Sequence, residues 1–294
     1  MFTPISCGDV LEVEESDLED PDEMRGIILE LSEYIEHLSN DRDQENIIDD
    51  ITRIKRILPH KFVFPGELLR QTNLINRLVT LMKDDKVISF YAGDLLTNVV
   101  YKNPTALELL INENPGELLR SWWKSNFQRH FHDAAFITSH LMDNPSTLDF
   151  ALSEGLLGEA IDRLKRPMLK MSDQSNTKGT LSYDDIRECL NVLKIAFVKL
   201  PDDKTSDSLP AFYNIADLAS HSENWLYLSF DVAYIAVILA SKGLSNALIS
   251  QGSHALLFRC LIDHDFHVSY TYILKFAALC LFNEGKELGL EVLK

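Results

Sequence analysis

Apolar residues recur every three to four positions through most of the chain, which is the spacing of one face of an α-helix. The first such segment starts at Pro21, where Asp20 can cap a helix and proline suits the first helical turn. Its apolar face comprises Met24, Ile27, Ile28, Leu31, Tyr34, Ile35 and Leu38. No segment shows the alternation of a half-buried β-strand, so the pattern predicts an all-α fold.

Two passages that start 41 residues apart have nearly the same layout. The first is "NPTALELLINENPGELLRSW" from Asn103, and the second is "NPSTLDFALSEGLLGEAIDRL" from Asn144. Each opens with Asn-Pro and continues as a short apolar helix, a break at glycine or Pro-Gly, and a second short helix. This similarity predicts a repeated helical unit rather than an irregular globule.

A long helix is predicted before each of six breaks, at intervals of 45, 41, 56, 42 and 42 residues. The breaks are Pro59, Pro104, Pro145, Pro201, Gly243 and Gly285. The longest interval contains the polar segment Met171–Thr180, which we expect to be a mobile loop. A repeat of about 40–47 residues built from two or three helices is typical of a stacked helical solenoid. We therefore expect long helices that end near residues 58, 102, 143, 200, 242 and 284.

The passage "LLTNVVYKNPTALELLINENPGELLRSW" resembles the third helix of an armadillo repeat followed by the first two helices of the next repeat. "VILASKGLSNALISQGSHALLFRCLI", residues 237–262, has the same layout. The resemblance to armadillo and related HEAT repeats covers roughly residues 40–294. It implies an all-α, right-handed armadillo-like superhelical solenoid of about five to six repeats, here over residues 21–294, in which neighbouring repeats bury each other's apolar faces.

The charge is concentrated at the N-terminus. Residues 1–50 hold 17 acidic and two basic side chains, whereas residues 51–294 hold 28 acidic and 26 basic ones. We expect residues 1–20 to be a disordered acidic leader, because they are acidic and lack periodicity. A body without a basic face predicts no binding to nucleic acid or to an anionic membrane surface.

Other features of the sequence indicate a cytoplasmic protein, with a nuclear pool left open. The N-terminus has no secretory signal, no apolar run reaches the length of a membrane span, and the four cysteines show no paired spacing. A new helix starts in "KELGLEVLK" after Gly285 without a following helix to cover it. We therefore expect either a longer native chain or a contact through the C-terminal repeat.

Motifs for chemistry are missing from the sequence, so we predict no cofactor, no metal and no catalytic residue. Nucleotide-binding glycine patterns and hydrolase or kinase signatures do not occur. The histidines of two short clusters lack partners at metal-ligand spacing, and packing or capping explains them better. These clusters contain His130, His132 and His140, and His264 and His267. Asp184 and Asp185 fall at a helix start, where carboxylates offset the helix dipole.

In the nuclear-import adaptors of the armadillo family, tryptophan and asparagine on the third helices bind a basic peptide. Here Asn98 matches the family asparagine, but the array does not continue along the chain. Trp122 and Trp123 fall on a second helix, where packing is the simpler role. The resemblance therefore does not imply an import receptor.

A stripe along the predicted third helices forms the candidate partner-binding surface. Its N-terminal part is polar, and Tyr91, Asp94, Asn98 and His132 should share one concave patch. The predicted contact residues are Tyr91, Asp94, Asn98, His132, Ser139, Glu188 and Asn191. Further along, Phe230, Val237 and Leu279 are better explained by contacts with neighbouring helices. A basic cluster that includes Lys55 precedes Pro59, where it either contacts the leader or faces solvent.

We interpret the chain as a non-catalytic scaffold or adaptor whose concave face binds a partner protein. An extended peptide or an amphipathic helix would suit such a groove, and Asp94 would favour a Lys or Arg in it. Two alternatives stay open: a regulatory subunit that docks on an enzyme or a cytoskeletal complex, and an enzyme with an unfamiliar site.

Overall fold

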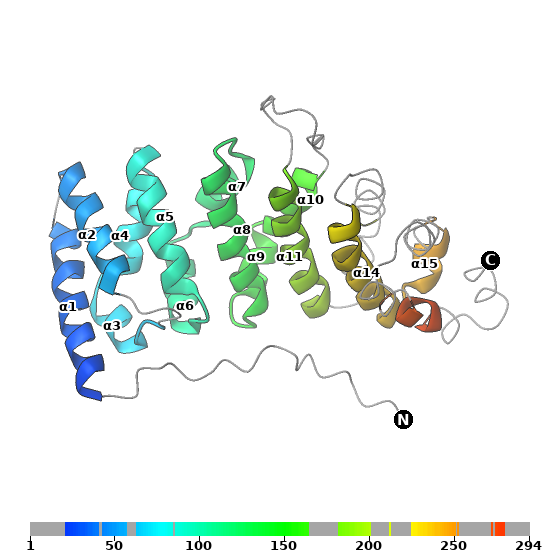
Figure 1. Ribbon diagram of the computed structural model, residues 1–294, viewed down its shortest axis with the longest axis horizontal. Helices are drawn as coiled ribbons and strands as arrows, with labels where there is room; N and C mark the ends of the chain where they lie inside the picture. The colour runs from blue at the N-terminus through cyan, green and yellow to red at the C-terminus, as the bar shows by residue number, and fades with distance from the viewer. Residues whose placement is uncertain are drawn as a thin grey trace. The chain divides into compact units, whose positions relative to one another are not determined.

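The computed structural model describes residues 21–40, 43–57, 63–84, 86–164, 182–200, 212, 225–250, 252, 272 and 274–279. Within these residues every regular element is an α-helix, and no strand occurs (Figure 1). The chain divides into two compact units, residues 1–114 (unit 1) and residues 115–294 (unit 2). The predicted leader, the loop Met171–Thr180, the sixth helix end near residue 284 and the segment after Gly285 lie outside the described residues.

The helices follow one another in a regular order of lengths. Unit 1 contains α1 (Pro21–Asn40), α2 (Gln44–Ile57), α3 (Gly66–Gln71), α4 (Leu74–Met82), α5 (Lys86–Val100) and α6 (Pro104–Asn112). In unit 2 the described helices are α7 (Gly116–Lys124), α8 (Gln128–Asp143), α9 (Leu148–Ser153), α10 (Leu156–Leu164), α11 (Tyr183–Lys199), α14 (Trp225–Ser241) and α15 (Ser245–Ser250). A short helix, a helix of nine residues and a long helix recur in α3–α4–α5, α6–α7–α8 and α9–α10–α11.

The long helices α2, α5, α8, α11 and α14, called third helices below, each have 14 to 17 residues. They end at Ile57, Val100, Asp143, Lys199 and Ser241. Each end lies within two residues of the position that the repeat intervals predicted. The expected repeat is therefore confirmed for the part of the chain that the structure describes.

The repeat is also visible in the backbone of the turns. Asn114, Gly155 and Gly252 each come two residues after a short helix, α6, α9 or α15, and each has a positive φ, of 49°, 70° and 78°. Lys102 and Gly243 occupy the same position after α5 and α14, with φ of 49° and 80°. A left-handed residue just beyond a helix end lets backbone N–H groups reach the last carbonyls.

The two Asn-Pro passages start their helices differently. Asn103 caps α6, where its side chain accepts a hydrogen bond from the N–H of Ala106 and donates one to the carbonyl of Phe64 at 2.9 Å. By contrast, Asn144 accepts bonds from the N–H and hydroxyl of Ser146, both at 3.0 Å. This local turn precedes α9, which begins only at Leu148.

In unit 1, α1 packs on α2 and α4, and α5 packs on α2, α4 and α6 (Figure 1). The apolar faces of these helices form the core, with Leu31, Ile51, Leu78 and Leu95 fully buried. Polar bonds join helices about one repeat apart, such as Arg77 Nε to the carbonyl of Leu38 at 2.9 Å. Each helix thus buries a face against a neighbouring repeat.

In unit 2, α8 packs on α7, α9 and α11, while α11 also packs on α10 and α14 (Figure 1). Trp123 is buried against this core and donates from its indole nitrogen to the hydroxyl of Thr138 at 3.0 Å. The ring of Trp122 stacks on His130 with a centroid distance of 4.3 Å. The packing role predicted for both tryptophans is confirmed, and His130 is part of the same packing.

Candidate partner-binding faces

The α5 face, which we define as Tyr91, Asp94 and Asn98, lies on one side of the third helix α5 in unit 1. The spacing of three and four residues places these side chains in one row. Asn98 is exposed, Tyr91 and Asp94 are half-buried, and the residues between them include the fully buried Leu95 and Leu96. The stripe on α5 that the sequence selected is therefore the part of this helix that the core of unit 1 does not use.

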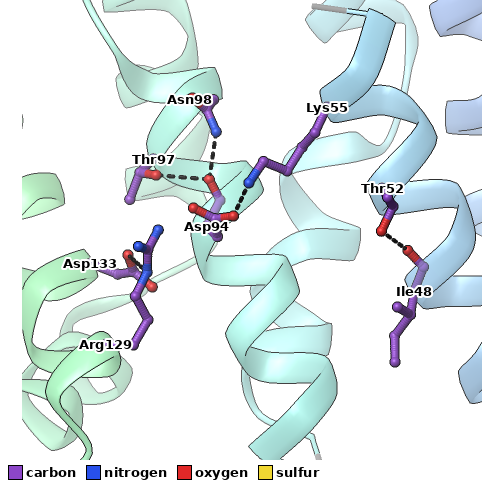
Figure 2. A network of polar contacts seen from close by, with 8 residues as sticks. All are labelled: Ile48, Thr52, Lys55, Asp94, Thr97, Asn98, Arg129 and Asp133. Carbon is purple, nitrogen blue, oxygen red and sulfur yellow. Dashed lines mark hydrogen bonds and ion pairs between the residues drawn. The ribbon is translucent and has the colours of Figure 1, made fainter.

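The carboxylate of Asp94 is already paired with a positive charge, because Lys55 of α2 forms an ion pair with it (Figure 2). Thr97 Oγ1 and Asn98 Nδ2 both donate to the backbone carbonyl of Asp94, each at 2.8 Å (Figure 2). Within unit 1 the α5 face is thus ordered by its own polar contacts. The sequence identified Lys55 as basic but did not connect it to Asp94.

The α8–α11 face of unit 2 comprises His132 and Ser139 on α8, and Glu188 and Asn191 on α11. All four side chains are half-buried. Ser139 Oγ donates to the carbonyl of Phe136 at 2.7 Å, which is a bond within its own helix. His132 and Glu188 lie close enough that the histidine influences the pKa of the carboxyl group. Of the predicted residues, His132 on α8 and Glu188 on α11 therefore lie near each other.

A polar contact between the two helices of this face involves a carboxylate that the sequence assigned only to the helix dipole. His132 Nε2 lies 3.2 Å from Asp185 Oδ1. Asp185 also forms a reciprocal capping box with Ser182 at the start of α11. Burial raises the pKa of Asp185, but the hydrogen bonds from His132 and Ser182 and the nearby charge of Arg163 outweigh it, so the net pKa is lowered.

Glu188 has the opposite balance. Burial raises the pKa of its carboxyl group and exceeds the opposing effects of His132, Arg187 and Lys194. A carboxyl group that has a raised pKa and lies near a histidine can mark a functional site. The neighbouring carboxylate, Asp185, is part of the capping box that starts α11. Helix formation therefore explains why this carboxylate lies beside His132.

Arg163 of α10 contacts the C-terminal end of α7 and the ring of Phe131 on α8. Its Nη1 donates to the carbonyls of Trp123 at 3.1 Å and Ser125 at 2.8 Å, and its guanidinium lies 4.3 Å from the ring centroid of Phe131. The side chain is buried. Sequence reasoning missed it, although its distance of about one repeat from the residues it binds was a usable signal.

Another missed pair joins α11 to α14, where Lys194 Nζ lies 2.8 Å from Asp231 Oδ1. Also on α14, the rings of Phe230 and Tyr234 both meet Tyr272 edge to face, with centroid distances of 4.9 and 5.2 Å. The packing role expected for Phe230 agrees with this contact. Val237 and Leu279 are half-buried.

The remaining candidates for chemistry have structural contacts. His140 Nδ1 lies 3.0 Å from the carbonyl of Phe136 and its ring stacks on Phe136, whereas His264 and His267 lie outside the described residues. Among the described residues, no group of three or more His, Cys, Asp or Glu side chains could hold a metal ion. None of the described helices has both the length and the apolar character needed to cross a bilayer.

Comparison with known proteins agrees with this geometry at the level of the fold. No protein-family model matches the sequence, and no curated protein is significantly similar to it. Solved structures with similar folds include designed armadillo repeat proteins. A designed armadillo repeat protein in complex with the peptide (KR)4 is 13% identical with a TM-score of 0.66, over 85% of this chain and 99% of that one.

Two further structures show the same likeness. A computationally designed armadillo repeat protein for modular peptide recognition is 14% identical, with a TM-score of 0.67 over 85% of this chain and 99% of that one. An engineered protein is also 14% identical, with a TM-score of 0.64 over 87% of this chain and 98% of that one. At such low identity the likeness shows the fold alone. The chain has an all-α, armadillo-like helical repeat fold.

Proposed function

We propose that the chain is a non-catalytic scaffold or adaptor whose third helices bind an extended segment of a partner protein. The observation that carries this proposal is the α5 face. On this face Tyr91 is half-buried and Asn98 is exposed, whereas apolar residues of α5 such as Leu95 and Leu96 pack in the core. An amphipathic aromatic ring beside an exposed amide is a common composition for a protein-binding surface.

The fold gives independent support. Designed proteins of the same fold are described as a complex with the peptide (KR)4 and as intended for modular peptide recognition. An extended peptide can contact several third helices in turn, taking one or two side chains at each repeat. We therefore infer a protein partner, and the prediction for the α8–α11 face extends the same mode to unit 2.

The polar cluster on the α8–α11 face also favours binding over catalysis. His132 and Asp185 are spaced like a base and its orienting carboxylate, but Asp185 is used to start α11. The hydroxyl next to them belongs to Ser182, which is the N-cap of α11 in the same capping box. The alternative of a regulatory subunit remains a narrower version of the same proposal, in which the partner is an enzyme or a cytoskeletal component.

The test is partner recovery from native lysate with the full chain and a double variant, Tyr91→Ala with Asn98→Ala. Truncation of an aromatic anchor at a hot spot costs about 2 kcal/mol, or roughly thirtyfold in affinity, so the proteins recovered with the wild type should be depleted. Circular dichroism should show that helicity is retained.

A matched control is Tyr101→Ala with Asn112→Ala, which removes the same two residue types from unit 1 outside the α5 face. Tyr101 lies in the turn after α5 and Asn112 ends α6. The control should recover partners as the wild type does. Equal recovery with both double variants would contradict the proposed role of the α5 face.

A further inference from the structure

Two aspartates on third helices each pair with a lysine from the preceding third helix. Lys55 of α2 pairs with Asp94 of α5 in unit 1, and Lys194 of α11 pairs with Asp231 of α14 in unit 2. The partners are 39 and 37 residues apart, which is close to one repeat. Each pair therefore joins third helices that are about one repeat apart, with one pair in each unit.

The pair in unit 1 is more accessible than the pair in unit 2, where Asp231 is buried. The side chains of Lys55 and Asp94 are 33% and 17% exposed, and those of Lys194 and Asp231 are 22% and 10% exposed. Neither aspartate caps a helix, because both lie within the length of α5 or α14. The partly exposed pair of Lys55 and Asp94 adds little to stability, so its main effect is on the charge that the α5 face presents.

We propose that Lys55 and Lys194 determine specificity by occupying the positions that a Lys or Arg side chain of a bound peptide would need. The third-helix face of each unit would then select an extended partner segment that is uncharged opposite its own aspartate, Asp94 or Asp231, and would reject basic segments. This inference rests on the proposed function. It also replaces the expectation that Asp94 favours a basic ligand.

The physical reason is competition together with repulsion. A basic ligand side chain must displace a tethered ammonium group and then lie beside it, and unlike partners are often discriminated by such repulsive contacts. An uncharged segment meets no such barrier. On the α5 face it can use the exposed amide of Asn98 for hydrogen bonds and the half-buried ring of Tyr91 for contact area.

The experiment titrates fluorescein-labelled (KR)4 peptide with the full chain at low ionic strength and follows fluorescence anisotropy. Lys55→Met and Lys194→Met keep most of the aliphatic stem and remove the charge. Each should bind the peptide more tightly than the wild type. Lys55→Met should gain about fivefold, the effect of releasing one partly exposed carboxylate, and Lys194→Met should gain less because Asp231 is buried. Adding Asp94→Asn to Lys55→Met should return the affinity to the wild-type value.

Lys124→Met is the matched control. Lys124 pairs with Glu159 at 2.8 Å between α7 and α10, so this variant changes the net charge equally but frees a carboxylate away from the third helices. It should not gain affinity for (KR)4. A neutral peptide, (SQ)4, should bind all variants alike and controls for altered folding.

Absence of a gain in either Lys55→Met or Lys194→Met would overturn the proposal. An equal gain in Lys124→Met would do the same, because it would show a general charge effect. A failure of the proposed function has a different signature, since Tyr91→Ala with Asn98→Ala would then leave partner recovery unchanged whatever the (KR)4 titration shows.

Discussion

Asp94 in unit 1 and Asp185 in unit 2 are both aspartates on a third helix, and both pair with a basic group on another third helix of the same unit. Their surroundings differ. Asp94 lies within the length of α5, its side chain is 17% exposed, and it pairs with a lysine of α2. The side chain of Asp185 is 7% exposed and caps α11. The same kind of pair therefore modifies surface charge in one unit and begins a helix in the other.

Local features of the molecule could be predicted from the sequence better than contacts between repeats. The breaks at proline and glycine and the spacing of apolar residues predicted helix ends to within two residues, because chain geometry and burial act locally. The incomplete burial of the stripe residues on α5 and α11 was predictable for the same reason. Asp184 and Asp185 were likewise placed correctly at a helix start.

Contacts between repeats were harder to predict. Lys55 with Asp94, Arg163 with the carbonyl of Trp123, and Lys194 with Asp231 all join residues 37 to 40 positions apart. Only the superposition of one repeat on the next brings such residues together, and many charged residues could fill each position. The delayed start of α9 was also missed, because a local bond from Ser146 to Asn144 competes with helix formation.

The largest effect is expected for Arg163→Met in unit 2. It removes two hydrogen bonds to the carbonyls of Trp123 and Ser125 from a buried side chain, and unsatisfied buried carbonyls cost about 1–3 kcal/mol each. We expect the free energy of unfolding, measured by urea titration, to fall by about 3 kcal/mol. Arg77→Met removes one bond from a part-buried site in unit 1 and should cost about 1 kcal/mol. An equal loss in both variants would contradict this ranking.

A loss of about 2 kcal/mol is expected for Asp185→Ala, because the variant loses a reciprocal helix cap and the bond from His132. Asp184→Ala is the control: it changes an exposed carboxylate in the same turn outside the capping box, and should cost less than about 0.5 kcal/mol. Similar losses would show that the helix dipole, rather than the cap, sets the role of these residues.

The Asp185 contribution should depend on pH. The pKa of this carboxyl group is lowered in the folded state, so the folded chain holds on to the ionised form. Its stabilisation is therefore fully present above the unfolded pKa of about 3.9 and is lost as the pH falls through the folded pKa. The gap between wild type and Asp185→Ala should be large in urea titrations at pH 6 and should shrink at pH 3. A constant gap would contradict the assigned charge state.

The turns permit a smaller comparison of the two units. Lys102 in unit 1 and Gly243 in unit 2 both adopt a left-handed backbone two residues after a third helix. Lys102→Gly should raise the free energy of unfolding by about 1 kcal/mol, because a side chain in this region is strained, and Gly243→Ala should lower it by a similar amount. Lys102→Ala removes the same side chain without relieving the strain, so it should not stabilise.

The smallest effect, and the one that separates Asp94 from Asp185 most directly, is expected for Asp94→Asn. The variant loses a partly exposed ion pair with Lys55, and pairs of this type contribute about 0–1 kcal/mol because solvent already screens them. We expect a change below about 0.5 kcal/mol in the free energy of unfolding, and a similar change for Lys55→Met. Asp185→Asn makes the same chemical change where the carboxylate is buried and caps α11, and it should cost more. If Asp94→Asn were as costly as Asp185→Asn, the pair in unit 1 would be part of the folded framework, and its release could not tune binding without weakening the helix packing of α2 and α5.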